Sequence, residues 1–312
     1  MHALLSTARV ANVPSVVSNV WVGVVLGIVM RVYAEEWIPS APWVPAGFLA
    51  VAGVLLYIGG NFFNDWMDHK WDAEHRPERA LPRGLFPTRL YAALAVCLMG
   101  AGVTVAGAVN LRSGMVAGGI VFWIIVYTVW HKRSAWAVVP MGMCRALLPV
   151  MGFLALLPKV DSISMVIMIS PVACGLFAYI MGLSLSARYE SMAKPPMRVG
   201  VMSRGLLLMT AVFLALGNRI FSLDRLASIW GVLPYLVWTG CCLRFWRKPV
   251  PKLVSGLLAG IPLVDWMVLL PVAATFAGNP REGAWHLAIV SFAIPPLAFV
   301  SALLLQRLAP AT

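Results

Sequence analysis

Residues 44–64 read VPAGFLAVAGVLLYIGGNFFN, and the chain continues from residue 65 with DWMDHKWD. The first stretch is about 20 residues long and mostly apolar, which is enough to cross a hydrocarbon core of about 30 Å as a helix. The second stretch is polar and acidic. The sequence therefore predicts a membrane-spanning helix that ends in an acidic segment at the membrane surface.

Comparable apolar runs recur from one end of the chain to the other. Of its 312 residues, 61% are hydrophobic and only 12% are charged, about half the charged share of a soluble domain. Backbone groups in lipid must bond to one another, which leaves helices or closed barrels, and these runs are too long and too continuously apolar for barrel strands. We therefore expect one all-α transmembrane domain over residues 1–312, a polytopic bundle of nine or ten helices. The expected spans cover residues 14–33, 44–64, 89–109, 113–131, 138–157, 163–186, 203–219, 226–245, 254–277 and 285–305.

The two longest polar connections, about residues 65–88 and 187–202, follow the second and the sixth span. This spacing predicts two similar halves, about 1–157 and 158–312, whose polar extensions face each other across the mouth of a central cavity. Most Lys and Arg residues fall in loops on that side, so the positive-inside rule places the cavity mouth and both termini in the cytoplasm. We expect a multi-pass protein of a bacterial inner membrane, whose basic loops attract anionic lipid. The sequence shows no nucleic-acid module.

The acidic segment places polar side chains on one helix face. At about 100° per residue, Asn61, Asn64, Asp65, Asp68 and Asp72 fall within an arc of roughly 100°. Carboxylates three and four positions apart repel one another, so we expect something positive among them. Mg²⁺ prefers hard oxygen ligands and is commonly held by one or two carboxylates plus substrate phosphates, so the pattern predicts a Mg²⁺-bridged diphosphate site. The alternative is a solvated helix end whose acids pair with nearby basic residues, namely Lys70, Arg76 and Arg79.

The pattern NxxxDxxxD, here Asn64, Asp68 and Asp72, resembles the first signature of the UbiA superfamily of intramembrane prenyltransferases. Residues 9–14 (RVANVP) and 127–132 (YTVWHK) are similar to that family's first helix and to its Tyr/Lys element after the fourth helix. The resemblance covers most of the chain. It implies a UbiA-like fold and transfer of a prenyl group from a prenyl diphosphate, with Mg²⁺, to a small acceptor, either aromatic or lipid.

The resemblance also implies which residues bind the metal. Asp68 and Asp72 would be the metal ligands, with Asp65 as an additional ligand. Asn64 would place an oxygen or a bound water at the site. Concentrated positive charge stabilises a departing diphosphate, which is the purpose such a metal would serve.

Three further residues receive roles from the resemblance. Lys132 and Arg79 would contact the diphosphate, and Tyr127 would donate a hydrogen bond to it. Lys132 completes the predicted catalytic set, together with Asp68 and Asp72.

The family's second acidic signature is incomplete in this chain. Residues 182–191 read GLSLSARYES, and Ser186 and Glu190 stand at the two positions where the family has acids. The resemblance then makes Glu190 a metal ligand and Ser186 a substrate contact, although a serine hydroxyl is a weak, neutral ligand. With MGMCRA at 141–146, this run resembles the EboC-like branch of the superfamily. A second function therefore stays open: a non-catalytic UbiA-like component that binds a lipid or metabolite in a membrane export or assembly system.

Two ionisable residues, Arg145 and Asp265, lie inside expected spans. Charges at such depth are costly and usually face a cavity or a partner. Arg145 would line the diphosphate or acceptor chamber and Asp265 would orient a polar acceptor, or both would be structural groups between helices. Asn19 is likewise either a substrate contact or a polar link between helices.

Overall fold

The computed structural model describes residues 2–34, 42–132, 134–156, 162–188, 197–221, 223–246, 250–277 and 284–308. Within these ranges every regular element is helical, and ten helices are long and apolar enough to cross a membrane. The predicted all-α membrane bundle is thereby confirmed.

The first half of the chain opens with a short helix, α1 (His2–Ala8), and a 3-10 turn, η1 (Val10–Asn12). Pro14 lies in the first turn of the next helix, where its missing N–H costs nothing. The helices that follow are α2 (Val13–Tyr33), α3 (Trp43–His75), α4 (Thr88–Val109), α5 (Leu111–Trp130) and α6 (Val138–Ala155), with a 3-10 turn η2 (Ala135–Ala137) before α6. The expected span 44–64 is therefore only the first part of α3, which continues unbroken through the acidic segment.

The second half contains α7 (Ser162–Arg188), α8 (Met197–Ile220), α9 (Arg225–Phe245), α10 (Val250–Ala259), α11 (Ile261–Ala277) and α12 (Ala284–Leu305). The expected span 254–277 lies within the candidate span Pro251–Ala277, which a turn at Gly260 divides into α10 and α11. Pro262 explains the break, since it cannot donate the backbone hydrogen bond that a continuous helix needs there.

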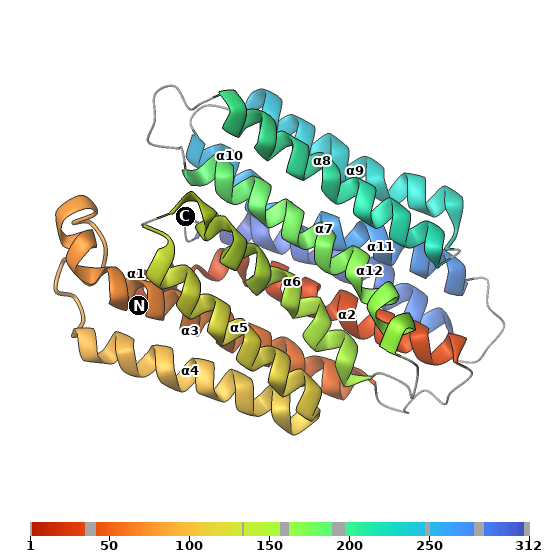
Figure 1. Ribbon diagram of the computed structural model, residues 1–312, viewed down its shortest axis with the longest axis horizontal. Helices are drawn as coiled ribbons and strands as arrows, with labels where there is room; N and C mark the ends of the chain where they lie inside the picture. Colours follow the sequence, from red (N-terminus) through yellow and green to blue (C-terminus); the bar gives the residue numbers. More distant parts are fainter. Residues whose placement is uncertain are drawn as a thin grey trace.

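The helices pack side by side into one bundle, with α2 and α11 at its centre (Figure 1). Helix α2 contacts α3, α6, α11 and α12, while α3 packs on α4, and α7 packs on α8. The outer helices α4, α5 and α8 keep most of their surface exposed. The predicted likeness between the two halves stays a prediction.

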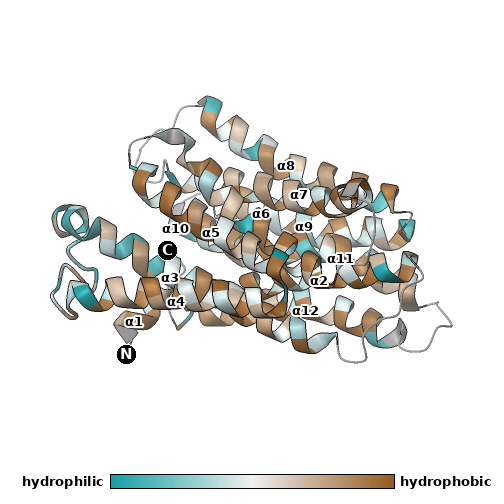
Figure 2. Ribbon diagram, turned by 60° about the horizontal axis from the view of Figure 1, so that its bottom comes forward, coloured by the Kyte–Doolittle hydropathy of each residue, from teal (hydrophilic) through white to brown (hydrophobic). Residues whose placement is uncertain are grey.

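The outer surface of the bundle is apolar along the length of the helices, and hydrophilic residues gather near the helix ends and the α3–α4 connection (Figure 2). Large hydrophobic side chains such as Val96, Leu111 and Met115 are well exposed on α4 and α5. Exposed apolar surface on this scale suits contact with lipid tails.

Helices α2 and α6 approach each other unusually closely through two glycines. A methyl group added to Gly23 would place its carbon 1.9 Å from the Pro149 carbonyl oxygen, and one added to Gly152 would lie 2.3 Å from the Val20 oxygen. Small residues permit such close backbone contact between membrane helices. This contact brings Asn19 on α2 and Arg145 on α6 to one level of the bundle.

Candidate functional site

Asp68 and Asp72 at the end of α3 are buried, Asp65 is half-buried, and basic side chains cover all three. Asp68 Oδ1 lies 2.6 Å from Lys132 Nζ, and Asp68 Oδ2 lies 3.0 Å from His131 Nε2. Lys132 Nζ also lies over the Trp71 ring, 4.3 Å from its centroid. The positive charge expected among the carboxylates is therefore present at Lys132, which follows the end of α5 together with His131.

Arg79 covers the other two aspartates. Its Nη1 lies 2.7 Å from Asp72 Oδ2 and 3.3 Å from Asp65 Oδ1, and Asp72 is almost fully buried. Burial alone would lower the pKa of Arg79, but the two carboxylates outweigh it and raise that pKa above its usual value. Arg79 therefore stays charged and holds the turn after α3 against the helix.

The alternative of a solvated helix end fails for these acids, because Asp68 and Asp72 are buried. That alternative pairs the acids with Lys70, Arg76 and Arg79. Within the described part of the chain, only Arg79 of these three forms ion pairs with them. Lys70 and Arg76 are exposed, and Arg76 lines the neighbouring cavity.

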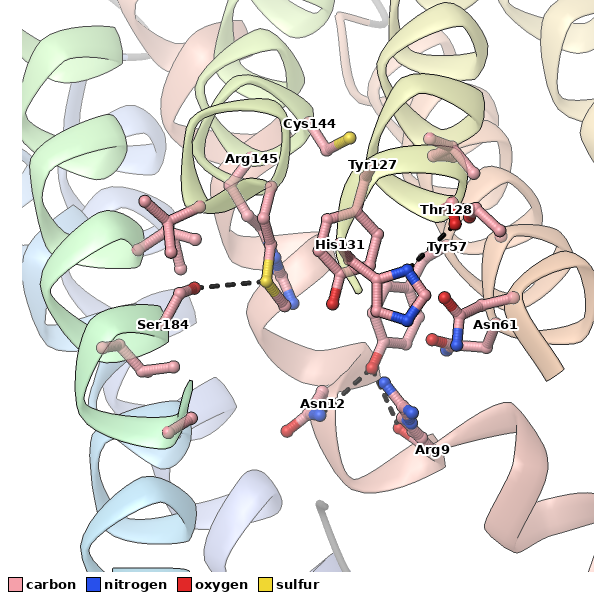
Figure 3. A pocket seen from close by; sticks show the side chains of 18 of the residues that line it. Arg9, Asn12, Tyr57, Asn61, Tyr127, Thr128, His131, Cys144, Arg145 and Ser184 are labelled. Carbon is pink, nitrogen blue, oxygen red and sulfur yellow. Dashed lines mark hydrogen bonds between the residues drawn. The ribbon is translucent and has the colours of Figure 1, made fainter. Parts of the chain in front are cut away.

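A cavity of about 670 Å³ lies beside these acids: Asn64 and His131, which contact Asp68, line it, whereas the three aspartates themselves do not. One face of α3 forms a wall, where lining residues recur every three or four positions from Gly53 to Asn64, about 16 Å along the helix axis. Most of the remaining wall is apolar and comes from α5, α6, α7 and α10. Polar side chains converge on this space from several helices (Figure 3), among them Asn12, Tyr57, Asn61, Tyr127, Thr128, His131, Arg145 and Ser184.

His131 lines the cavity and also contacts Asp68. No role was predicted for it from the sequence. Its Nδ1 lies 2.9 Å from the Thr128 carbonyl oxygen while Nε2 faces Asp68, and Tyr127 stacks on the ring at 5.1 Å. Arg188 Nη1 donates to the His131 carbonyl oxygen at 3.0 Å. The position of His131 directly before Lys132 was the available signal.

The amino-terminal segment closes one side of the cavity with Arg9. Arg9 adopts a left-handed conformation with φ 48°, unusual for a residue other than glycine. Asn61 Nδ2 donates to the Ala8 carbonyl oxygen at 3.1 Å, and the Tyr57 hydroxyl donates to the Arg9 carbonyl oxygen at 3.5 Å. Side chains of α3 thus hold the strained turn, and the Arg9 side chain lines the cavity.

The intramembrane groups Arg145 and Asp265 are linked through Asn19. Arg145 Nη1 donates to Asn19 Oδ1 at 3.1 Å, and Asn19 Nδ2 donates to both Asp265 oxygens at 3.1 and 2.9 Å. Ser18 adds a 2.5 Å hydrogen bond to Asp265 Oδ2. Arg145 lines the cavity, whereas Asn19 and Asp265 lie behind it, so the predicted direct substrate contacts of those two are not supported.

Ser186 does not line the cavity. Its hydroxyl lies 2.7 Å from that of Ser203 on α8 and bonds the Gly182 carbonyl oxygen at 3.2 Å. Helix α7 presents Ser184 to the cavity and turns Ser186 toward α8, and the substrate contact expected of Ser186 stays a prediction. Glu190, the other predicted member of this second cluster, lies outside the described residues.

The UbiA prenyltransferase family model matches residues 20–194, more than half of the chain. The chain belongs to this family. Among curated proteins, the chain is 38% identical over 114 residues to the protoheme IX farnesyltransferase of Caulobacter sp. (strain K31), covering 34% of this chain and 33% of that one. It is 29% identical over 117 residues to the digeranylgeranylglyceryl phosphate synthase of Thermococcus kodakarensis, covering 38% and 39%. The chain thus matches only about a third to a half of the length of such relatives.

Solved structures share the UbiA fold of this chain. The apo structure of a UbiA homolog from Aeropyrum pernix K1 gives a TM-score of 0.65 at 14% identity, covering 82% of this chain and 96% of that one. A UbiA homolog from Archaeoglobus fulgidus bound to GPP and Mg²⁺ gives 0.51 at 11% identity, covering 98% and 99%. At these identities the likeness concerns the fold.

The acidic segment of α3 beside the cavity fits a Mg²⁺ ion whose coordination a further ligand completes. Asn64 Oδ1 is buried without a hydrogen-bond partner, while its Nδ2 donates to Asp68 at 3.4 Å. Carboxylate and amide oxygens are the ligands that Mg²⁺ takes. Across the described ranges, no group of three or more His, Cys, Asp or Glu side chains could hold a metal by itself. Water or substrate phosphate would therefore supply the remaining ligands.

Replacing Arg79 with glutamine is expected to lower the unfolding free energy by about 1–3 kcal/mol, because the buried Asp72 carboxylate loses its charged partner. Thermal unfolding of the purified protein in detergent measures the change. Arg83→Gln is the matched control, since Arg83 is an exposed arginine of the same connection. Equal unfolding temperatures for the two variants would contradict the structural importance of the Arg79 pairs.

Proposed function

We propose that this protein is a Mg²⁺-dependent intramembrane prenyltransferase, which moves a prenyl group from a prenyl diphosphate to a small aromatic or lipid acceptor. One observation carries the proposal: a largely apolar cavity of about 670 Å³ inside a membrane bundle is lined by Asn64 and His131, both of which contact the buried Asp68. Lys132 and Arg79 pair with Asp68 and Asp72 beside it. Apolar walls suit an isoprenoid chain, and the polar end suits a diphosphate. Membership of the UbiA family supports the same activity.

Asn64, Asp68 and Asp72 would hold the metal, with Asp65 nearby. Bound Mg²⁺ would neutralise negative charge on the diphosphate and make it a better leaving group. In the reaction the bond between the allylic carbon and the diphosphate oxygen breaks, the diphosphate leaves with the electron pair, and the acceptor forms the new carbon bond and gives up a proton.

Lys132 and His131 would act on the diphosphate. Lys132 Nζ now pairs with Asp68, and His131 Nε2 lies 3.0 Å from the same carboxylate. A metal at Asp68 would take over its neutralisation and leave the two side chains for the phosphate oxygens beside it. Arg9, Arg76 and Arg188 line the same end of the cavity and add positive charge. Arg79, whose Nη1 pairs with both Asp65 and Asp72, is better explained as the group that holds these acids than as a diphosphate contact.

The site would open toward the cytoplasm of a bacterial inner membrane, with both termini on that side. The excess of Lys and Arg in the loops at the acidic end supports this orientation. Anionic lipid at the same surface would contact those basic loops.

Product analysis tests the function. The purified protein is incubated with Mg²⁺, tritiated geranyl diphosphate or a longer homologue, and candidate acceptors. We expect a prenylated product that disappears when EDTA removes the metal. Equal affinity for the diphosphate with and without Mg²⁺ would contradict the proposal.

A second candidate function is a non-catalytic UbiA-like component that binds a lipid or metabolite for export or assembly, as in the EboC-like branch. Ser186 favours this candidate. Its hydroxyl is hydrogen-bonded to that of Ser203 on α8, so the second acidic signature has one metal ligand fewer. Turnover that vanishes in Glu190→Ala would exclude this candidate. Mg²⁺-dependent diphosphate binding without any product would support it.

A further inference from the structure

A second hollow lies on the outer surface of the second half of the bundle. It is a groove of about 600 Å³ between α9 and α12, with the first turns of α11 as its floor. One face of α9 from Pro234 to Trp246 forms one wall, and residues of α12 from Pro296 to Val300 form the other. The lining is apolar or aromatic, with the thiol of Cys241 among it, and none of it belongs to the central cavity. We call this feature the α9–α12 groove.

Aromatic rings fix the shape of the α9–α12 groove. The Trp238 ring lies edge-on to the Phe299 ring at 4.8 Å and to the Trp246 ring at 5.3 Å. The two valines on its rims, Val237 and Val300, are 56% and 50% exposed. Because α9, α11 and α12 all belong to membrane-spanning segments, lipid is the phase that this open groove meets.

The length of the groove matches one leaflet of a membrane. Its α9 wall, from Trp246 back to Pro234, extends about 18 Å along the helix axis. Half of a hydrocarbon core of about 30 Å is about 15 Å. Pro234 and Pro296, which lie inside their helices, mark the inner end of the groove, and an interior proline commonly bends a helix. The groove therefore fits a lipid acyl chain that enters at the Trp246 end.

Basic side chains gather at the Trp246 end of the groove. The guanidinium carbon of the exposed Arg244 lies 5.8 Å from the ring centroid of Phe245, which is a wall residue. Lys252, also exposed, precedes Gly256 by about one turn of α10. A methyl carbon added to Gly256 would lie 2.7 Å from the Trp246 ring, so this side of α10 adjoins the groove. Both cations are therefore beside its mouth.

Arg307 adds a third exposed cation at the same end. Gln306, the residue before it, donates from Nε2 to the Ser255 carbonyl oxygen at 2.9 Å, which places the end of α12 against α10. Within the described ranges, none of the three cations forms an ion pair with a carboxylate. Basic residues at the end of a cleft between membrane helices attract anionic lipid headgroups. Charge and shape thus favour a single kind of occupant.

We propose that the α9–α12 groove binds one anionic phospholipid, with an acyl chain along the groove and its phosphate at Arg244, Lys252 and Arg307. The lipid would come from the leaflet at the end of the bundle that carries α10 and the α3–α4 connection (Figure 1). Helix α10 also supplies Val254 and Leu258 to the wall of the central cavity, so a lipid in the groove would support that wall from outside. The site needs neither Mg²⁺ nor a prenyl diphosphate and does not depend on the proposed function.

Photo-crosslinking tests the site. The purified protein is reconstituted in vesicles of dioleoylphosphatidylcholine that contain a small fraction of a phospholipid with a diazirine in one acyl chain. The probe is phosphatidylglycerol or phosphatidylcholine with identical chains, so that only the headgroup charge differs. Peptides that carry lipid after irradiation are identified and quantified by mass spectrometry. We expect adducts on the groove faces of α9 and α12, with about 10-fold more from phosphatidylglycerol than from phosphatidylcholine.

Charge variants test the mouth of the groove. The triple variant Arg244→Gln/Lys252→Gln/Arg307→Gln should lower the phosphatidylglycerol yield in the groove to the phosphatidylcholine yield, because both headgroups then lack a charged partner. The matched control removes three exposed arginines near the starts of α4 and α8, namely Arg89→Gln/Arg198→Gln/Arg204→Gln. This control changes the net charge equally, so it should keep the preference. Loss of the preference in both triple variants would overturn the headgroup site.

A filling variant tests the groove itself. Val300→Trp places a large ring on the rim and should lower the groove adducts of both probes, whereas Val212→Trp on α8, at a valine that is 48% exposed, should not. Thermal unfolding shows that each variant is folded, and the wild-type comparison of headgroups stands without them. Equal yields of the two probes in the wild-type groove would overturn the proposal. Crosslinks between two copies of the chain through α9 or α12, without lipid adducts there, would also overturn it and assign the groove to a protein interface.

Discussion

Asp68→Asn is expected to abolish Mg²⁺-dependent binding of a prenyl diphosphate and to lower prenyl transfer by about 10²- to 10³-fold. The amide has no charge to bind the metal, and Lys132 and His131 lose the carboxylate that they contact at 2.6 and 3.0 Å. Binding of tritiated geranyl diphosphate is measured with Mg²⁺ and with EDTA, and product formation is measured with Mg²⁺. Thermal unfolding is recorded on the same sample, so that a folding defect is recognised as such.

Glu74→Gln is the matched control for this variant. Glu74 is an acid on the same helix whose side chain is 77% exposed, and it lies away from the Lys132 and His131 contacts. The Glu74→Gln variant should bind the prenyl diphosphate and form product as the wild type does. Asp68→Asn binding that equals the wild type, both with metal and with EDTA, would contradict the metal site on α3.

Gly23→Ala is expected to destabilise the protein by about 1–3 kcal/mol or more, because the new methyl carbon would lie 1.9 Å from the Pro149 carbonyl oxygen. Backbone atoms cannot give way as a flexible side chain does, so α2 and α6 must separate. Separation would also move Asn19 away from Arg145, whose hydrogen bond spans the same two helices. Thermal unfolding in detergent measures the loss, and we expect Gly152→Ala to behave alike.

Gly100→Ala is the control for the glycine substitutions. Gly100 is a glycine of α4 with open space around the position that a methyl group would occupy. Alanine favours a helix over glycine, so this variant should match or exceed the wild-type stability by up to about 1 kcal/mol. Equal unfolding temperatures for Gly23→Ala and Gly100→Ala would contradict the tight α2–α6 contact.

The acidic face of α3 was predictable because it depends only on local geometry. In a helix the positions of Asn64, Asp68 and Asp72 follow from their spacing, and α3 does remain helical to His75. The cations that cover these acids were only partly predictable. Lys132 came from the family resemblance, while the contact of His131 with Asp68 requires the end of α5 to pack beside α3, which no spacing within either helix encodes.

Ser186 and Arg145 show the limit of sequence patterns within membrane helices. Helix α7 is apolar on all sides, so its periodicity does not tell which side faces the cavity, and the structure presents Ser184 rather than Ser186 there. For Arg145 the sequence left a cavity role and a structural role open. The structure gives it both, since Asn19 holds the guanidinium that also lines the cavity.

By itself, the sequence determined an all-α membrane protein with ten spans and an acidic helix end, because lipid forces each apolar segment to satisfy its own backbone and because helical spacing places the acids on one face. The tertiary structure alone decided which cations neutralise the acids, how closely α2 and α6 approach, and which side chains line the cavity. Those features depend on contacts between segments far apart in the chain. Apolar helix surfaces carry no periodic signal that says which of their sides will meet.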